Sequence, residues 1–181
     1  MDWRKEYAEK IVSVEEAVRH VQSGNRIVFT HACGEAQALT DELVRQADRL
    51  ENVEIVHMVA MGKAPYCQPG MEKHFRHNAL FVGGSTRKAV EEGRGDYTPC
   101  FFHEIPKLFT DGTLPVDVAF LQLSEPDENG VCSYGVSVDY TQPAAEAAKL
   151  VVAQGNKNMR YTYGNGINLK DIDYVVEKDE P

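Results

Sequence analysis

A glycine pair, a hydroxyl and an arginine stand directly after the apolar stretch Ala79 to Val82. The residues are Gly83, Gly84, Ser85 and Arg87. Glycines expose backbone amides that a ligand can approach closely. A guanidinium can hold a carboxylate or a phosphate through two parallel hydrogen bonds. The segment is therefore a candidate binding loop, although a Gly-rich turn that only serves packing is the alternative.

A second candidate loop is the sequence THACGEAQ at residues 30–37. Gly34 lies where an apolar stretch gives way to a helical pattern, so backbone amides at a helix start could face a ligand there. The glycine spacing is neither that of a P-loop nor G-x-G-x-x-G. Neither ATP nor a dinucleotide is therefore specifically indicated. The alternative is that Gly34 merely makes a tight turn.

The third candidate loop follows the most apolar stretch of the chain and covers residues 124–139. Residues 126–130, with the sequence PDENG, are a strong turn signal. After this turn, Ser133, Gly135 and Ser137 alternate with bulky residues. A period of two would place the small residues on one face, where a ligand could lie against backbone. An edge hairpin packed on a helix is the alternative.

Other catalytic and metal-binding patterns are missing. There is no G-x-S-x-G motif, and no serine, histidine and aspartate are placed to suggest a triad. His57 lies in an apolar stretch and is interpreted as a core histidine, whereas His74 and His77 are expected on a helix surface. The cysteines are far apart, without C-x-x-C or paired histidines, so we expect no metal site and reduced thiols; they are Cys33, Cys67, Cys100 and Cys132.

Composition narrows the class of protein. The formal net charge is -9, from 19 Lys+Arg and 28 Asp+Glu, which argues against nucleic acid or an anionic membrane as a partner. Residues 63–94 are locally basic, so an anionic ligand would prefer that region. The N-terminal sequence has no apolar run of signal-peptide length, and no segment approaches a membrane span. We therefore expect a cytoplasmic protein.

Helical and strand signals alternate along the chain. Ser13 and Glu16 form a capping box that starts a helix, and Gly24 supplies a stop. A helical period covers 35–50. Short apolar stretches predict strands at 26–29, 53–59, 79–82, 100–102, 116–123, 150–153 and 174–176. This order predicts an α/β fold with an open, mostly parallel sheet and helices on both faces. In such sheets ligands bind at the carboxyl ends of strands, which is where the candidate loops fall.

These loops also carry a family resemblance. The segments 30–39, 59–109, 123–140 and 147–159 resemble the amino-terminal half of the acetyl-CoA hydrolase/transferase family. Two motifs are specific to it: V-G-G-x-x-R-x-A, which begins at Val82, and S-x-P-D-x-x-G-x-x-S-x-G-V-S-V-D, which begins at Ser124. The resemblance implies that residues 1–181 form a single CoA-transferase (NagB/RpiA-like) domain. It also implies a second, carboxyl-terminal domain across the active site.

The resemblance implies a covalent mechanism with coenzyme A as a substrate and no covalently bound cofactor. A glutamate attacks an acyl-CoA thioester, becomes a glutamyl-CoA thioester, and passes CoA to a carboxylic acid such as acetate. It points to 4-hydroxybutyryl- or butyryl-CoA as donor. In the family this glutamate lies in the carboxyl-terminal half, so the chain alone is expected to be inactive. The nucleophile motif of the family is not matched at Glu35, Glu104, Glu125 or Glu128.

On this resemblance, the amino-terminal half contributes a wall around the acyl group. The residues expected in that wall are Met61, Gly62, Gly83, Gly84, Ser85, Arg87, Ser133, Gly135, Ser137 and Gly34. The expected partners are the carboxyl-terminal domain and a second copy of the chain, because apolar surface would otherwise be exposed. A non-catalytic acyl- or CoA-binding module and half of an acyl-CoA hydrolase are the alternatives. Two departures from the family pattern, Gly155 and Arg160, predict that the last thirty residues are altered or poorly ordered. A third departure is Ala36, where the family usually has a proline.

Overall fold

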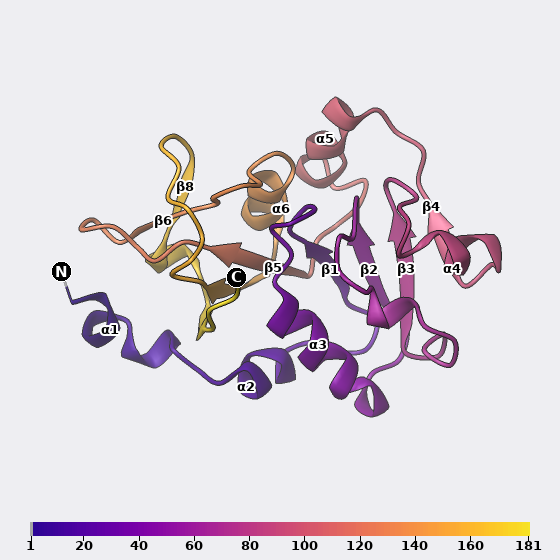
Figure 1. Cartoon of the computed structure of the whole chain (residues 1–181), viewed down its shortest axis with the longest axis horizontal. Coiled ribbons are helices and arrows are strands. Elements are labelled where there is room, and N and C mark those ends of the chain that lie inside the picture. Colours follow the sequence, from indigo (N-terminus) through magenta and orange to yellow (C-terminus); the bar gives the residue numbers. More distant parts are fainter. Residues whose placement is uncertain (1) are drawn as a thin grey trace.

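The computed structural model describes residues 2–181 and contains an open parallel sheet covered by helices (Figure 1). The seven strands lie in the order β4-β3-β2-β1-β5-β7-β9. Because β2 and β5 lie on opposite sides of β1, the strand order reverses there, which is where such sheets bind ligands. The bounds are β1 (Arg26–Phe29), β2 (Val53–His57), β3 (Phe75–Ala79), β4 (Gly95–Tyr97), β5 (Val118–Leu123), β7 (Leu150–Gly155) and β9 (Tyr174–Glu177).

Helices cover both faces of the sheet, as the sequence predicts. Figure 1 shows α2 and α3 on one side and α5 and α6 on the other. The α-helices are α1 (Trp3–Glu6), α2 (Val14–Arg19), α3 (Gln37–Arg45), α4 (Arg87–Glu91), α5 (Ile105–Thr110) and α6 (Thr141–Ala147). Single 3-10 turns are η1 (Ala8–Lys10), η2 (Ala47–Arg49), η3 (Pro65–Cys67), η4 (Phe102–Glu104) and η5 (Leu169–Asp171).

Strand β5 is buried on both faces of the sheet. Phe120 packs in the cluster that contains α2 and α3, whereas Leu121 and Leu123 pack in a cluster on the other face. Every residue of β5 is buried. A strand buried on both sides needs an unbroken apolar run rather than an alternating one. This is why its position could be predicted from the sequence.

The predicted start of α2 at Ser13 is confirmed, although only the Ser13 half of the capping box forms, because the Glu16 side chain pairs with Arg19. The Ser13 hydroxyl accepts a hydrogen bond from the Glu16 amide over 3.1 Å, which satisfies one of the unpaired amides of the first turn. Gly24 follows the helix with a φ of +79°, a conformation that favours glycine. The chain then enters β1 at the predicted residue.

Two predicted strands are wrong. The strand predicted at 79–82 lies instead at β3, where Phe75, His77 and Ala79 are buried, while Phe81 is 52% exposed. The strand predicted at 100–102 is replaced by turn η4, because Phe101 and Phe102 point outward and are 72% and 47% exposed. His77 is therefore a strand residue and not a helix-surface residue as predicted.

A small antiparallel pair lies beside the main sheet and was not predicted. It is formed by β6 (Val131–Ser133) and β8 (Gly166–Asn168). Cys132 and Ile167 pack from it against the face of β5 and β7. None of the helices within residues 2–181 is long and apolar enough to cross a membrane.

Candidate functional site

Short polar contacts join the loops that follow β1, β2 and β3, which are residues 30–36, 58–64 and 80–86 and are called the joined loops below. The Ala32 amide donates to the Val59 carbonyl over 3.0 Å. The Ser85 hydroxyl lies 2.7 Å from the carbonyl oxygen of Gly62 and 3.1 Å from that of Ala60. The structure therefore brings the predicted residues Gly62 and Ser85 together at the carboxyl edge of the sheet, next to the strand-order reversal.

Gly34 stands where a side chain would be crowded: a Cβ there would lie 2.8 Å from Thr30 Cγ2 and 3.1 Å from the Cβ of Ser137. Close approach of this kind favours glycine. A Cβ on Gly62 would lie 2.5 Å from Gln37 Oε1, the end of a flexible side chain that can move away. Gly34 thus connects the loop after β1 to the 133–139 segment, and Ser137 joins the same group.

Of the remaining predicted residues of this edge, Met61, Gly84 and Arg87 are exposed to solvent, whereas Gly83 is buried. Met61 is 66% exposed, and a Cβ on Gly84 would meet no atom within 4 Å. Next to it, Gly83 accepts a hydrogen bond from the Arg87 amide, which starts α4. The exposed Arg87 forms no ion pair with any residue from 2 to 181, whereas Arg76 pairs with Asp96. Arg87 is therefore a cation available to an anionic ligand.

Ser133 and Gly135 are placed differently from the other predicted residues. The Ser133 hydroxyl is buried and forms hydrogen bonds with the backbone and hydroxyl of Thr162. Gly135 has a φ of +63°, and a Cβ there would overlap Met159 Sδ. Both residues face the 159–162 segment rather than the joined loops. The period of two did not persist because β6 ends at Ser133 and the chain turns.

A histidine–carboxylate pair that sequence reasoning missed lies beside Gly34. His31 Nδ1 is 2.8 Å from Asp139 Oδ2, and the Ser137 hydroxyl donates to the same oxygen over 3.1 Å. Burial pushes the pKa of Asp139 upward, but the hydrogen bonds and charge of His31 and the Tyr140 amide outweigh it, so this pKa lies below its ordinary value. Asp139 is therefore an ionised carboxylate that accepts a hydrogen bond from His31 Nδ1.

Glu35 is a buried carboxyl group next to the same loops. Its side chain carries two oxygens without a hydrogen-bond partner among the described residues, and the residue is 5% exposed. Burial raises its pKa, and the nearby Thr40 hydroxyl and Gly62 amide offset that effect only in part. The sequence placed Glu35 in the loop but gave no sign that its carboxyl group is buried.

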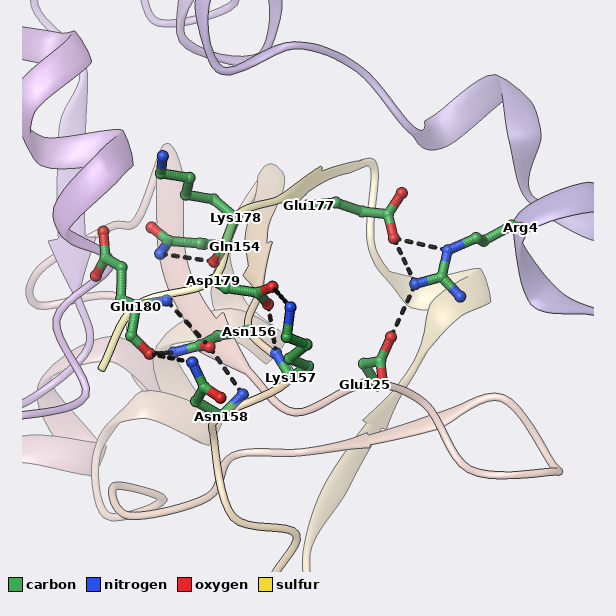
Figure 2. A network of polar contacts seen from close by, with 10 residues as sticks. All are labelled: Arg4, Glu125, Gln154, Asn156, Lys157, Asn158, Glu177, Lys178, Asp179 and Glu180. Carbon is green, nitrogen blue, oxygen red and sulfur yellow. Dashed lines mark hydrogen bonds and ion pairs between the residues drawn. The ribbon is translucent and has the colours of Figure 1, made fainter.

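Three buried amide side chains connect this edge to the end of the chain. Gln122 Nε2 donates to the Glu35 carbonyl over 2.7 Å, and Asn156 Nδ2 donates to Gln122 Oε1 over 2.7 Å. Figure 2 shows Asn156 and Gln154 holding the backbone of Glu180 and Lys178. The amide side chains therefore tie the residues after β9 to the loop after β1.

The segment with the departures Gly155 and Arg160 has regular structure up to Gly155. Gly155 is the last residue of β7 and pairs with Leu123 on one side and Glu177 on the other. A Cβ at Gly155 would meet its nearest atom at 3.8 Å, so the strand has room for a side chain there. The predicted disorder of this end is not seen, because Asn156 and its neighbours fix the backbone.

Two of the glutamates that do not match the nucleophile motif, Glu104 and Glu125, have structural contacts. Glu104 Oε2 accepts from the Phe101 amide over 2.9 Å. Glu125 forms an ion pair with Arg4, which also pairs with Glu177 (Figure 2). Glu128 lies exposed on the 126–130 turn. The contacts of Glu104 and Glu125 suit these two residues to stabilise local structure.

The core histidine is as predicted. His57 is fully buried, with Nδ1 3.1 Å from the Tyr66 hydroxyl and Nε2 3.0 Å from the Thr30 carbonyl. His74, by contrast, is not on a helix: its Nδ1 donates to the Leu50 carbonyl. Within the described part of the chain the cysteines are free thiols. No group of three possible metal ligands occurs between residues 2 and 181.

Known proteins match this chain over its whole length. The model of the acetyl-CoA hydrolase/transferase N-terminal domain matches residues 1–181. A 4-hydroxybutyrate coenzyme A transferase of Clostridium kluyveri is 57% identical over 182 residues, which cover 100% of this chain and 42% of that protein. A succinyl-CoA:cyclohexane-1-carboxylate CoA transferase of Geobacter metallireducens is 35% identical, covering 99% of this chain and 41% of its own length. The chain thus spans less than half the length of these relatives.

Solved structures agree with the fold. The crystal structure of 4-hydroxybutyrate CoA-transferase from Porphyromonas gingivalis superposes with a TM-score of 0.83 at 36% identity, covering 99% of this chain and 42% of that one. RipA from Yersinia pestis shares the fold with a TM-score of 0.92 at 24% identity. The chain therefore belongs to the acetyl-CoA hydrolase/transferase family, and it corresponds to the amino-terminal domain of that family.

Proposed function

We propose that this chain is the acyl-binding half of a CoA-transferase. A second, carboxyl-terminal half would supply a glutamate that takes the acyl group as a mixed anhydride and then carries CoA as a thioester. A carboxylic acid such as acetate would receive the CoA. The donors would be 4-hydroxybutyryl- or butyryl-CoA, as suggested by the transferases to which the chain is similar.

The observation that carries the proposal is the group of joined loops at the carboxyl edge of the sheet. Gly84 leaves backbone exposed and Gly62 is partly exposed, and Arg87 offers an unpaired cation near them. The Ser85 hydroxyl fixes the loop after β3 to the loop after β2. Such a surface can orient an acyl group and its carboxylate, and orientation supplies a large part of the rate in transfer between bound groups.

Water must be kept from the glutamyl thioester for transfer to prevail over hydrolysis. Exposed apolar side chains border the joined loops and would be covered by the second half. They include Met61, Phe81, Val136 and Val138. We propose the carboxyl-terminal domain as their partner, and self-association of the chain in its absence. The free cysteines are consistent with the cytoplasm as the compartment.

The test combines the chain with its carboxyl-terminal half, supplied as a separate polypeptide. Exchange of CoA between butyryl-CoA and labelled acetate is measured for each part and for the mixture. The proposal expects exchange from the mixture alone. A non-catalytic module would give no exchange in any combination, and net loss of thioester without transfer to acetate would indicate a hydrolase.

A further inference from the structure

The transfer chemistry proposed above leaves the His31–Asp139 pair without a proton-transfer role. Carboxylates attack thioesters and thiolates leave, so no step of the exchange requires a general base. The His31 and Asp139 side chains are both partly buried, 17% and 25% exposed, at the edge of the proposed acyl site, and removing such groups from water carries a cost. The pair is therefore better suited to recognising the substrate than to transferring a proton.

The contacts of Asp139 fix the orientation of the imidazole. Asp139 Oδ2 accepts from His31 Nδ1 and from the Ser137 hydroxyl, and its Oδ1 accepts from the Tyr140 amide over 2.6 Å. Because Nδ1–H donates its hydrogen bond to the carboxylate, Nε2 is the acceptor nitrogen of the neutral imidazole. Nε2 has no hydrogen-bond partner among residues 2–181, and the His31 side chain is 17% exposed.

Two aromatic side chains pack against the His31 ring. The ring packs edge-on against Phe102 and tilted against Tyr140, with ring centroids 5.6 Å apart in both cases. The Tyr140 hydroxyl donates to the Phe29 carbonyl and is not available to a ligand. Gly34 lies three residues beyond His31 and contacts Ser137, so the pair adjoins the joined loops. An aromatic corner with one polar acceptor suits a short aliphatic chain that ends in a hydrogen-bond donor.

We propose that His31 Nε2 accepts a hydrogen bond from the hydroxyl group of a hydroxyacyl substrate, and that Asp139 is the positioning residue that keeps Nε2 free for it. The inference rests on the proposed function and deepens it, because it assigns the selectivity between hydroxyacyl and plain acyl groups to this pair. A plain acyl chain leaves Nε2 buried without a partner when it binds, and such a loss disfavours the wrong substrate.

The test measures kcat/KM of the reconstituted two-half enzyme with 4-hydroxybutyryl-CoA and with butyryl-CoA, using acetate as acceptor. His31→Phe keeps an aromatic ring and removes the acceptor. The ratio of the two kcat/KM values should fall roughly tenfold, as expected for one net hydrogen bond of about 1.4 kcal/mol. The value for butyryl-CoA should stay within a factor of about three, a change under 1 kcal/mol. His20→Phe, a change of the same kind at a histidine stacked on Tyr174, should leave the ratio unchanged.

Asp139→Asn tests whether Asp139 orients the His31 ring or only stabilises the fold. It should lower the same ratio, and the 15N chemical shifts of the His31 ring should show that Nε2 is no longer the uniformly unprotonated nitrogen. Equal losses with both donors in folded His31→Phe would overturn the inference, since His31 would then contact a group common to both, such as the acyl carbonyl. An unchanged ratio would overturn it as well. Absence of CoA exchange in the wild type would overturn the proposed function, and this inference with it.

Discussion

The Ser85 hydroxyl lies 2.7 Å from the carbonyl oxygen of Gly62, so the loop after β3 is fixed to the loop after β2 by one side chain. The same hydroxyl lies 3.1 Å from the Ala60 carbonyl. Replacement by alanine removes the donor and leaves both carbonyls to find other partners. Ser85→Ala should therefore lower the free energy of unfolding by about 1 kcal/mol. In thermal unfolding of the chain, the midpoint should fall by roughly 2–4 °C. An unchanged midpoint would mean that the backbone alone holds the two loops together.

Gly84 offers a direct test of the loop's role because a side chain there meets nothing in the chain itself. Gly84→Val should leave the free energy of unfolding within about 0.5 kcal/mol of the wild type. If acyl-CoA lies against this backbone, the CoA exchange of the reconstituted enzyme should fall roughly 100-fold through misplacement of the substrate. The matched control is Gly155→Val, in a strand position with comparable room. Equal turnover of a folded Gly84→Val variant would remove this loop from the site.

The buried carboxyl of Glu35 predicts a pH dependence of stability. Its pKa is raised in the folded chain above the ordinary value of 4.5, chiefly by burial. The proton is therefore held more tightly in the folded state, and the contribution of Glu35 to stability is full below pH 4.5 and lost as pH rises through the folded pKa. Glu35→Gln should remove this loss and stabilise the chain by about 1 kcal/mol at pH 8. Urea unfolding of both proteins at pH 5 and pH 8 measures it; a variant that loses stability at pH 8 would contradict the account.

The buried histidines predict that the free energy of unfolding falls as the pH decreases, which is opposite to the effect of Glu35. Burial lowers the pKa of His57 to about 3 and that of His77 to about 4, from 6.5. The unfolded chain takes up these protons first, so stability is full above pH 6.5 and falls as pH decreases toward 4. Each histidine contributes a slope of up to about 1.4 kcal/mol per pH unit. Urea unfolding between pH 7 and pH 5 should show the loss, and His77→Gln should reduce its slope. A stability that does not change over this interval would refute the prediction.

The sequence predicted the elements whose burial follows from their own residues. β5 and β7 are apolar runs, and the Ser13 cap is a local signal, so each could be located from sequence. β3 could not, because its sequence, FRHNA, is polar and its side chains are satisfied by distant partners: Asn78 donates to Glu54 and Arg76 to Asp96.

The residues of the candidate site also fall into those that the local sequence predicts and those that it does not. The glycine-rich loops after strands could be recognised from sequence, because glycine often occurs where the backbone must approach another group closely. The partnership of His31 with Asp139 could not be, since the two lie 108 positions apart and only the fold brings them together. For the same reason Ser133 and Gly135 were grouped with the joined loops, while the turn after β6 directs them toward Thr162 and Met159.

Hydrogen–deuterium exchange of the reconstituted enzyme, with and without butyryl-CoA, tests most directly whether the joined loops form one wall of the acyl site. Binding should slow exchange of the amides at 60–62 and 83–87 together, while exchange at 135 and at 159–162 stays unchanged. Protection confined to 159–162, or absent from both loops in an enzyme saturated with the thioester, would contradict the central claim.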